Sequence, residues 1–99
     1  MIGVVEYKQL MESGTMTGVY MYSNGCHLCK KMEDKLKQFG IRVIAVIDCL
    51  TDTKYFLEQG FDKMPAVVLW INGEQKFIKT GEMFDLQLEQ FKQYLESFV

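Results

Sequence analysis

The sequence predicts an α/β fold with a central mixed four-stranded β-sheet and helices on both faces. Three observations predict it. Two apolar stretches, residues 19–23 and 43–47, flank an amphipathic helical pattern, which indicates parallel strands joined by a helical crossover. Two later apolar stretches flank Asn72-Gly73, a signal of a tight β-hairpin. Near the end of the chain, apolar residues at helical spacing indicate a closing helix that packs on the sheet.

The first part of the chain predicts a helix, a strand and a second helix. Apolar residues near the start recur at helical spacing before Gly14, which suits the end of a helix. They are Val4, Tyr7, Leu10 and Met11. Residues 19–23 are apolar on both faces and stop at Asn24-Gly25, as a buried strand followed by a turn does. The next helix ends at Gly40 and carries one apolar stripe. The stripe consists of Leu28, Met32, Leu36 and Phe39.

The middle of the chain predicts a second strand and a short helix. Residues 43–47 are apolar without alternation, so we expect this strand to be covered on both faces. Thr51 or Asp52 can cap a helix over residues 53–59 that ends at Gly60.

The last part predicts the hairpin and the closing helix. Residues 66–71 and 75–79 form the two antiparallel strands, so the sheet is mixed. The closing helix carries one apolar stripe toward a face of the sheet. This stripe consists of Phe84, Leu88, Phe91, Leu95 and Phe98.

Size, composition and charge limit the possible functions. The chain has 99 residues with 48% hydrophobic side chains, which predicts a single domain over residues 1–99. Its 11 basic and 13 acidic side chains give a net charge of -2, which is not the basic footprint of a nucleic-acid binder. Residues 1–11 lack the apolar core of a signal peptide, and no run of about eighteen apolar residues predicts a membrane span. We therefore expect a soluble, cytoplasmic protein.

The cysteines carry the clearest chemical signal. Three cysteines are an odd number, which favours reactivity in a reducing compartment over a disulfide framework. Cys26 and Cys29 fall where the first strand ends and the amphipathic helix begins, so their side chains share one face of its first turn. The helix N-terminus favours a thiolate over a thiol. We expect the outermost sulfur, that of Cys26, to attack a substrate disulfide and Cys29 to resolve the mixed disulfide.

Two other interpretations of the pair remain open at this point. The cysteines could be small buried residues, or they could be half of a zinc site. Zinc needs four ligands, and beyond the pair only His27 and Cys49 could contribute, without a second metal-ligand spacing. Redox activity is therefore the favoured interpretation, and no metal is expected.

The chain resembles the thioredoxin family over close to half of its length. Residues 19–30 run from the strand into the cysteine motif, and residues 60–91 match almost without gaps. The residues that carry the resemblance are Cys26-His27-Leu28-Cys29-Lys30, Met64-Pro65, Asn72-Gly73-Glu74, Gly81 and Gln87-Leu88 with Phe91. The resemblance implies the thioredoxin fold and a monomeric enzyme of electron transport that reduces protein disulfides. It implies no bound cofactor besides a redox-active Cys26–Cys29 disulfide, and regeneration by an NADPH-dependent thioredoxin reductase.

The resemblance also implies a substrate-binding surface around the pair. In the family a cis peptide bond precedes the matching proline, which exposes the backbone of Met64 for strand-like pairing with a substrate. The implied substrate-binding residues are His27, Leu28, Met64, Pro65 and Gly81.

The chain departs from the family pattern around the cysteines. Gly25 stands in place of a tryptophan, and His27-Leu28 stand in place of Gly-Pro. Tyr20 replaces the buried aspartate that helps deprotonate the resolving cysteine, and Ile44 falls near that aspartate's lysine neighbour. Water or His27 could then accept the proton.

Alternative functions and one further residue complete the sequence-based hypotheses. The chain could be a glutaredoxin-like, glutathione-coupled reductase, although the length from Pro65 to Asn72 and on to Gly81 resembles thioredoxin. It could also be a non-catalytic binding module or subunit. Cys49 follows the second strand and is expected to be an inert, partly buried thiol or else part of a regulatory disulfide.

Overall fold

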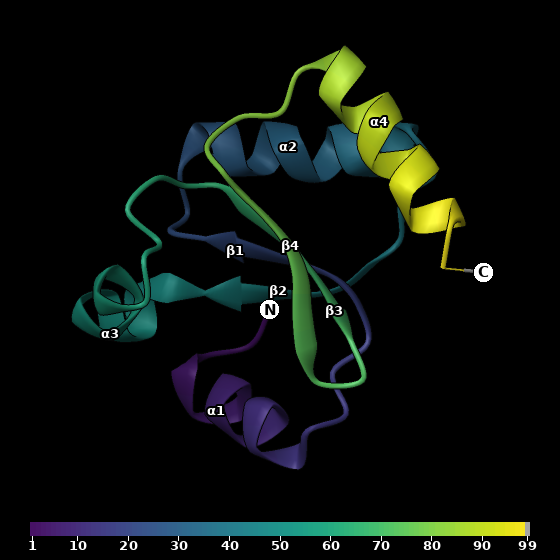
Figure 1. Ribbon diagram of the computed structural model, residues 1–99. Coiled ribbons are helices and arrows are strands. Elements are labelled where there is room, and N and C mark those ends of the chain that lie inside the picture. The colour runs from purple at the N-terminus through teal and green to yellow at the C-terminus, as the bar shows by residue number, and fades with distance from the viewer. Residues whose placement is uncertain (99) are drawn as a thin grey trace.

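The polypeptide folds into a mixed four-stranded sheet between two layers of helices (Figure 1). This computed structural model describes residues 1–98. The elements are α1 (Val4–Ser13), β1 (Gly18–Ser23), α2 (His27–Gln38), β2 (Val43–Asp48), the 3-10 turn η1 (Cys49–Asp52), α3 (Thr53–Glu58), β3 (Ala66–Ile71), β4 (Glu74–Thr80) and α4 (Asp85–Glu96). The strand order is β2-β1-β3-β4, with β1 and β2 parallel and the other pairs antiparallel. The predicted fold class is confirmed.

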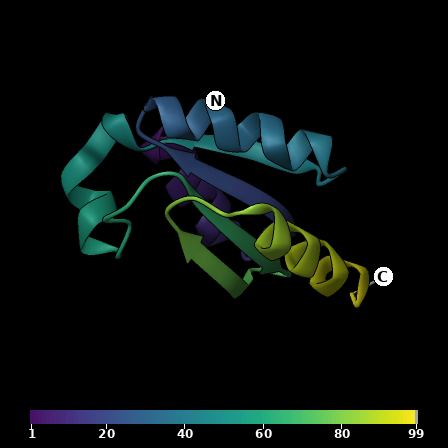
Figure 2. The same ribbon diagram turned by 90° about the horizontal axis from the view of Figure 1, so that it is seen from above.

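Each face of the sheet has its own apolar core. The helices α2 and α4 cover one face, and α1 and α3 cover the other (Figures 1 and 2). Alternation along β1 divides its side chains, so that Val19 and Met21 join the core under α2 and α4, while Tyr20 and Tyr22 join the core beside α1 and α3. Because β1 is central and covered on both sides, the end of β1 is held in a fixed position, and the cysteine motif starts there.

The expectation that residues 43–47 are covered on both faces is wrong at Ile44. This side chain is 45% exposed. The reason is the strand order: β2 lies at an edge of the sheet, where the covering layer is incomplete. An unbroken apolar run therefore did not identify a central strand.

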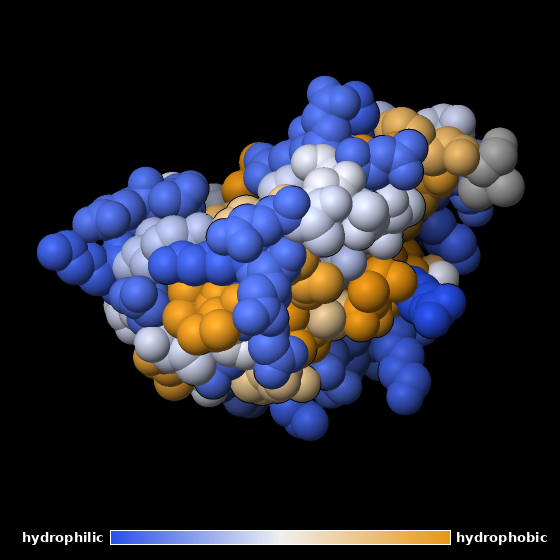
Figure 3. All heavy atoms as spheres, turned by 90° about the horizontal axis from the view of Figure 1, so that it is seen from below, coloured by the Kyte–Doolittle hydropathy of each residue, from blue (hydrophilic) through white to orange (hydrophobic). Residues whose placement is uncertain are grey.

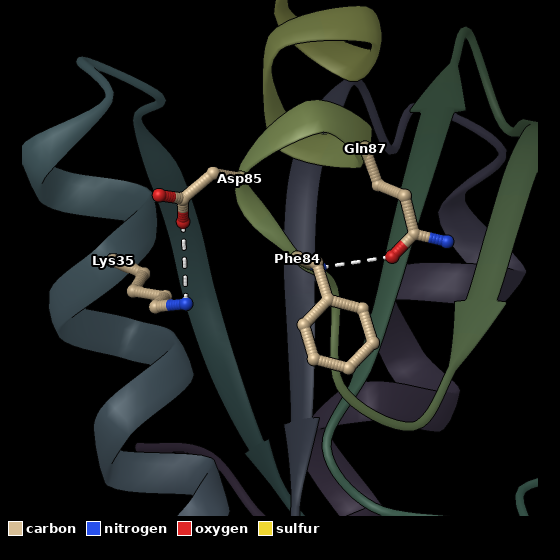
Figure 4. Close-up of polar contacts among 4 residues, drawn as sticks. All are labelled: Lys35, Phe84, Asp85 and Gln87. Carbon is tan, nitrogen blue, oxygen red and sulfur yellow. Dashed lines mark hydrogen bonds and ion pairs between the residues drawn. The ribbon is translucent and has the colours of Figure 1, made fainter.

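The apolar stripe of α4 is shorter than predicted. Leu88 and Phe91 are buried, but Phe84 is 62% exposed and stands at the N-cap, before the helix begins. Its backbone N–H donates to the side-chain oxygen of Gln87 over 2.9 Å (Figure 4). Phe98 follows the helix and is 43% exposed. The backbone at the helix start, rather than apolar packing, therefore determines the role of Phe84.

An ion pair joins the two helices that cover the same face. Lys35 Nζ of α2 lies 3.3 Å from Asp85 Oδ1 in the first turn of α4 (Figure 4). The Asp85 side chain is 74% exposed, so solvent screens the pair and its contribution to stability is small.

Of the two caps predicted for the short helix, Asp52 is correct. Its carboxylate accepts from the N–H of Tyr55 over 3.1 Å. The Thr51 hydroxyl accepts instead from the N–H of Val4 over 2.9 Å, which ties the start of α1 to η1. Just before that helix, Ile2 forms a parallel bridge with Ile47 on the outer side of β2. The chain start is thus fastened beside the end of β2.

The surface on the side of α1 and α3 carries apolar side chains on either side of a polar band (Figure 3). Leu50 of η1 and Leu57 of α3 are 62% and 54% exposed. None of the helices within residues 1–98 combines the length and the apolar character needed to cross a membrane.

We predict that Gly73→Ala destabilises the protein more than Gly60→Ala. Both glycines have a positive φ, +80° and +93°, so alanine at either position costs about 1–2 kcal/mol of stability. At Gly73 the added methyl group also meets the backbone carbonyl of Gly14, whereas at Gly60 it meets nothing within 4 Å. We expect this contact to cost a further ~1–3 kcal/mol. Urea unfolding of the two variants measures the difference, and equal losses would contradict the prediction.

Candidate functional site

Cys26 and Cys29 form a disulfide at the junction of β1 and α2. Their Cα atoms are 5.2 Å apart. Cys26 is the N-cap of α2 and is half-buried, whereas Cys29 lies inside the first turn and is 2% exposed. The pair lies at the start of the helix as the sequence predicted, with Cys26 the more accessible residue.

The sulfur of Cys26 caps the helix. Cys26 Sγ accepts from the backbone N–H of Cys29 over 3.2 Å. A helix N-terminus carries a partial positive charge and N–H groups without partners inside the helix. The contact that exists in the disulfide form is therefore one that favours negative charge on this sulfur after reduction.

The loop before the helix contains two polar side chains that the sequence analysis missed. Asn24 Oδ1 accepts from the N–H of Cys26 over 3.2 Å and lies 3.6 Å from Cys29 Sγ. Ser23 Oγ accepts from the N–H of Gly25 over 3.0 Å, and this serine is buried. Asn and Ser side chains commonly bond the N–H two residues ahead. This local preference could have predicted the bonds of Ser23 and Asn24 from the sequence, where Asn24-Gly25 indicated only a turn.

The register of the sheet brings a second loop to the cysteines. Ala66, the first residue of β3, pairs with Tyr22 in antiparallel register, so Met64 and Pro65 lie beside the loop that leaves β1. The Met64–Pro65 peptide bond is cis, as the resemblance implied. The N–H of Gly81 donates to the carbonyl of Pro65 over 2.8 Å. Met64, Pro65 and Gly81 are thus gathered at one end of the sheet.

The two residues between the cysteines are exposed. Leu28 is 42% exposed, and His27 also lies at the surface of the first turn. Neither side chain is part of a core cluster. Both are therefore available to another molecule.

Two hollows flank the cysteine loop. One, of about 130 Å³, contains both cysteines in its wall. Its other lining residues are Met1, Ser23, Gly25, Lys30, Glu33 and Val46. The second hollow, of about 110 Å³, lies on the side of η1 and α3. It is lined by Asn24, Cys49, Leu50, Thr53, Phe56, Leu57, Phe61, Asp62 and Met64. Asn24 and Met64 therefore share a surface depression next to the disulfide.

Cys49 is a buried free thiol. It is 3% exposed, and its Sγ lies 3.8 Å from the carbonyl oxygen of Ile47. Burial raises the pKa of the Cys49 thiol to about 12, so the thiol is neutral near pH 7. Only a thiolate is a good nucleophile, and this favours the inert interpretation over a regulatory disulfide.

Tyr20 does not replace the buried carboxylate as a base. It is 4% exposed, and burial raises the pKa of its phenol. A neutral phenol donates a hydrogen bond and does not accept a proton. Among residues 1–98, no group of three or more His, Cys, Asp or Glu side chains is arranged to hold a metal ion.

The comparisons with known proteins support the fold. No family model and no curated protein matches the sequence. Among solved structures, the desulfothioredoxin of Desulfovibrio vulgaris Hildenborough is 24% identical, with a TM-score of 0.66 over 85% of this chain and 88% of that one. The chain has the thioredoxin fold.

Other thioredoxin structures agree over more of the chain at lower identity. A thioredoxin of Nicotiana alata has a TM-score of 0.64 at 18% identity, over 96% of this chain and 90% of that one. An oxidised thioredoxin of Arabidopsis thaliana has a TM-score of 0.67 at 14% identity, over 98% and 95% of the two chains. The thioredoxin fold thus extends over nearly the whole chain.

We predict that Cys49 resists alkylation until the protein unfolds. With its pKa near 12, the thiol of the folded protein stays protonated and buried when reduced protein meets iodoacetamide at pH 8. Mass spectrometry of peptides should find the label on Cys26 first, and on Cys49 only in urea. Rapid native labelling of Cys49 would contradict its buried, neutral state.

The same shift gives a pH dependence of stability. The unfolded chain releases the Cys49 proton near pH 9, whereas the folded protein holds it to about pH 12. The contribution of Cys49 to stability is therefore complete below pH 9 and is lost as the pH rises toward 12. A Cys49→Ala variant should lose less stability than the unaltered protein between pH 8 and pH 11 in urea unfolding.

Proposed function

We propose that this protein is a thiol–disulfide oxidoreductase that reduces disulfides of other proteins through Cys26 and Cys29. The observation that supports it most strongly is the disulfide between a half-buried N-cap cysteine and a buried cysteine one helical turn away. The thioredoxin fold and the neighbours of that fold support the same chemistry.

The reaction is two successive exchanges. The Cys26 thiolate attacks one sulfur of the substrate disulfide, a mixed disulfide forms, and the first substrate sulfur leaves as a thiolate. Cys29 then attacks Cys26 Sγ, closing the Cys26–Cys29 bond and releasing the second substrate sulfur, which takes up the Cys29 proton. Two electrons pass from the pair to the substrate. The first substrate thiolate takes up a proton from solvent, equivalent to the one that Cys26 released, so the substrate ends as two thiols.

The surface around the pair suits an extended protein segment. Met64 precedes β3 and lies outside its hydrogen-bonded ladder, so its backbone is free to pair with a substrate strand. Leu28 and Leu50 are 42% and 62% exposed and offer apolar contacts. In this proposal His27, Leu28 and Met64 touch the substrate. The side chain of Pro65 is fully buried, so Pro65 acts by shaping the loop that presents Met64, and Gly81 supports that loop through its bond to the Pro65 carbonyl.

We propose a single domain over residues 1–99 that acts as a monomer in the cytoplasm. Its redox group is the Cys26–Cys29 disulfide, without a bound metal or organic cofactor. An NADPH-dependent thioredoxin reductase restores the dithiol.

We predict that Cys26→Ser abolishes the reduction of insulin disulfides, because the attacking sulfur is gone. Cys29→Ser should instead accumulate the mixed disulfide, because nothing releases the bound chain. Cys49→Ser is the matched control, and it should retain activity because this thiol lies outside the pair. Turbidity follows insulin reduction, and non-reducing mass spectrometry detects the trapped adduct. Activity that survives in Cys26→Ser would overturn the proposed function.

The regenerating system is tested separately. We predict that oxidised protein is reduced rapidly by NADPH with thioredoxin reductase and slowly by glutathione alone. The distance along the chain from Pro65 to Gly81, which resembles thioredoxin, is the reason for this order. The fraction of free thiols after timed incubation measures both rates. Faster reduction by glutathione would favour the glutaredoxin-like alternative.

A further inference from the structure

The side chain of Asn24 contacts both halves of the redox pair. Its Oδ1 atom accepts from the N–H of Cys26 over 3.2 Å and lies 3.6 Å from Cys29 Sγ. A disulfide sulfur has no hydrogen to donate. When the bond is reduced, Cys29 gains a thiol proton within reach of this oxygen, and a thiol is a weak donor to such an acceptor.

The two sulfurs therefore have partners of opposite character. Cys26 Sγ faces a donor, the N–H of Cys29 at 3.2 Å, and a donor stabilises a thiolate. Cys29 Sγ faces an acceptor, Asn24 Oδ1, and an acceptor stabilises the protonated thiol. Both contacts are present in the protein without a bound substrate.

We propose that Asn24 is a positioning residue, whose side-chain oxygen holds the thiol proton of reduced Cys29 so that the negative charge resides on Cys26. The inference rests on the proposed function, in which the pair cycles between dithiol and disulfide. Asn24 is not a base, because an amide oxygen does not take up a proton near pH 7. During the second exchange the proton of Cys29 passes to the departing substrate thiolate.

Other groups near the pair do not provide the same contact. The hollow that contains the cysteines is bordered by the charged side chains of Lys30 and Glu33 on α2. The hollow that contains Asn24 is bordered by Asp62 and by the thiol of Cys49. His27 follows Cys26 and is exposed. All of these groups stay unchanged when Asn24 alone is replaced, so a comparison of variants isolates its contribution.

The experiment is an NMR titration of the Cβ carbon shift of Cys29. It uses the full chain with Cys26→Ser, so that Cys29 titrates without a coupled sulfur. Into this background we introduce Asn24→Ala, Asn24→Asp or Ser23→Ala. Ser23→Ala is the matched control, because it removes the acceptor for Gly25 N–H in the same loop, and the Ser23 side chain forms no hydrogen bond with either sulfur.

We expect Asn24→Ala to lower the pH midpoint of Cys29 by about half a unit, the value of one weak hydrogen bond to the neutral form. Asn24→Asp keeps an oxygen at this place and adds negative charge, so it should raise the midpoint instead. Ser23→Ala should leave it unchanged. An unchanged midpoint in Asn24→Ala overturns the proposal, and so does an equal shift in Ser23→Ala, which would mean that loosening the loop is sufficient.

The outcome is independent of enzymatic activity. If Asn24→Ala fails to fold, Asn24→Asp decides the question, because it should raise the pH midpoint of Cys29. A midpoint in Asn24→Asp that is equal to or lower than that of the Cys26→Ser protein overturns the proposal. Because no substrate takes part, the midpoint shift and the loss of insulin reduction are separate results. Failure of the proposed function leaves the titration interpretable, and an unshifted titration leaves the assignment of Cys26 as nucleophile intact.

Discussion

The site depends on the position of one sulfur at the start of α2. Cys26 Sγ takes the place of a capping oxygen and accepts the N–H of Cys29. The helix is fixed in place by its apolar side chains, which pack against the sheet. Met32 and Leu36 are at most 1% exposed and pack into the core with Val19 and Met21 of β1. The strand against which the helix packs also leads into the loop, so the position of β1 determines the positions of both the helix tip and the loop.

Strand pairing makes a site from segments that are far apart in the sequence. The antiparallel pairing of β1 with β3 puts the Pro65 loop beside the cysteine loop. The pairing of β3 with β4 brings Gly81 to the same end, where its N–H meets the Pro65 carbonyl. A change of register by one residue would turn the side chains of β3 to the opposite face and separate these loops. The buried apolar side chains of β3 therefore maintain the site as well as the core.

Most elements could be predicted because their signals are local. The hairpin at Asn72-Gly73 needs a positive φ at both residues, and it has one at both. Ile44 could not be predicted as exposed, since an apolar run contains no information about which strand lies at the edge of a sheet. Asn24 could be expected to bond the N–H two residues ahead, but its distance to Cys29 Sγ depends on how α2 is set against β1. Contacts between elements are what a single sequence leaves undetermined.

Tyr20, which is buried in β1, cannot supply the negative charge that a carboxylate would place near the cysteine pair. A carboxylate below the pair would act through charge, whereas Tyr20 is neutral because burial disfavours its phenolate. In our proposal, short polar contacts are the means by which this chain distinguishes its two sulfurs. Cys26 Sγ accepts from the N–H of Cys29, and Cys29 Sγ lies 3.6 Å from Asn24 Oδ1, which can accept its proton after reduction. Such bonds act over short distances, so their effect depends on loop geometry to within a few tenths of an ångström. The bonds that Ser23 and Asn24 make to the backbone of their own loop hold that geometry.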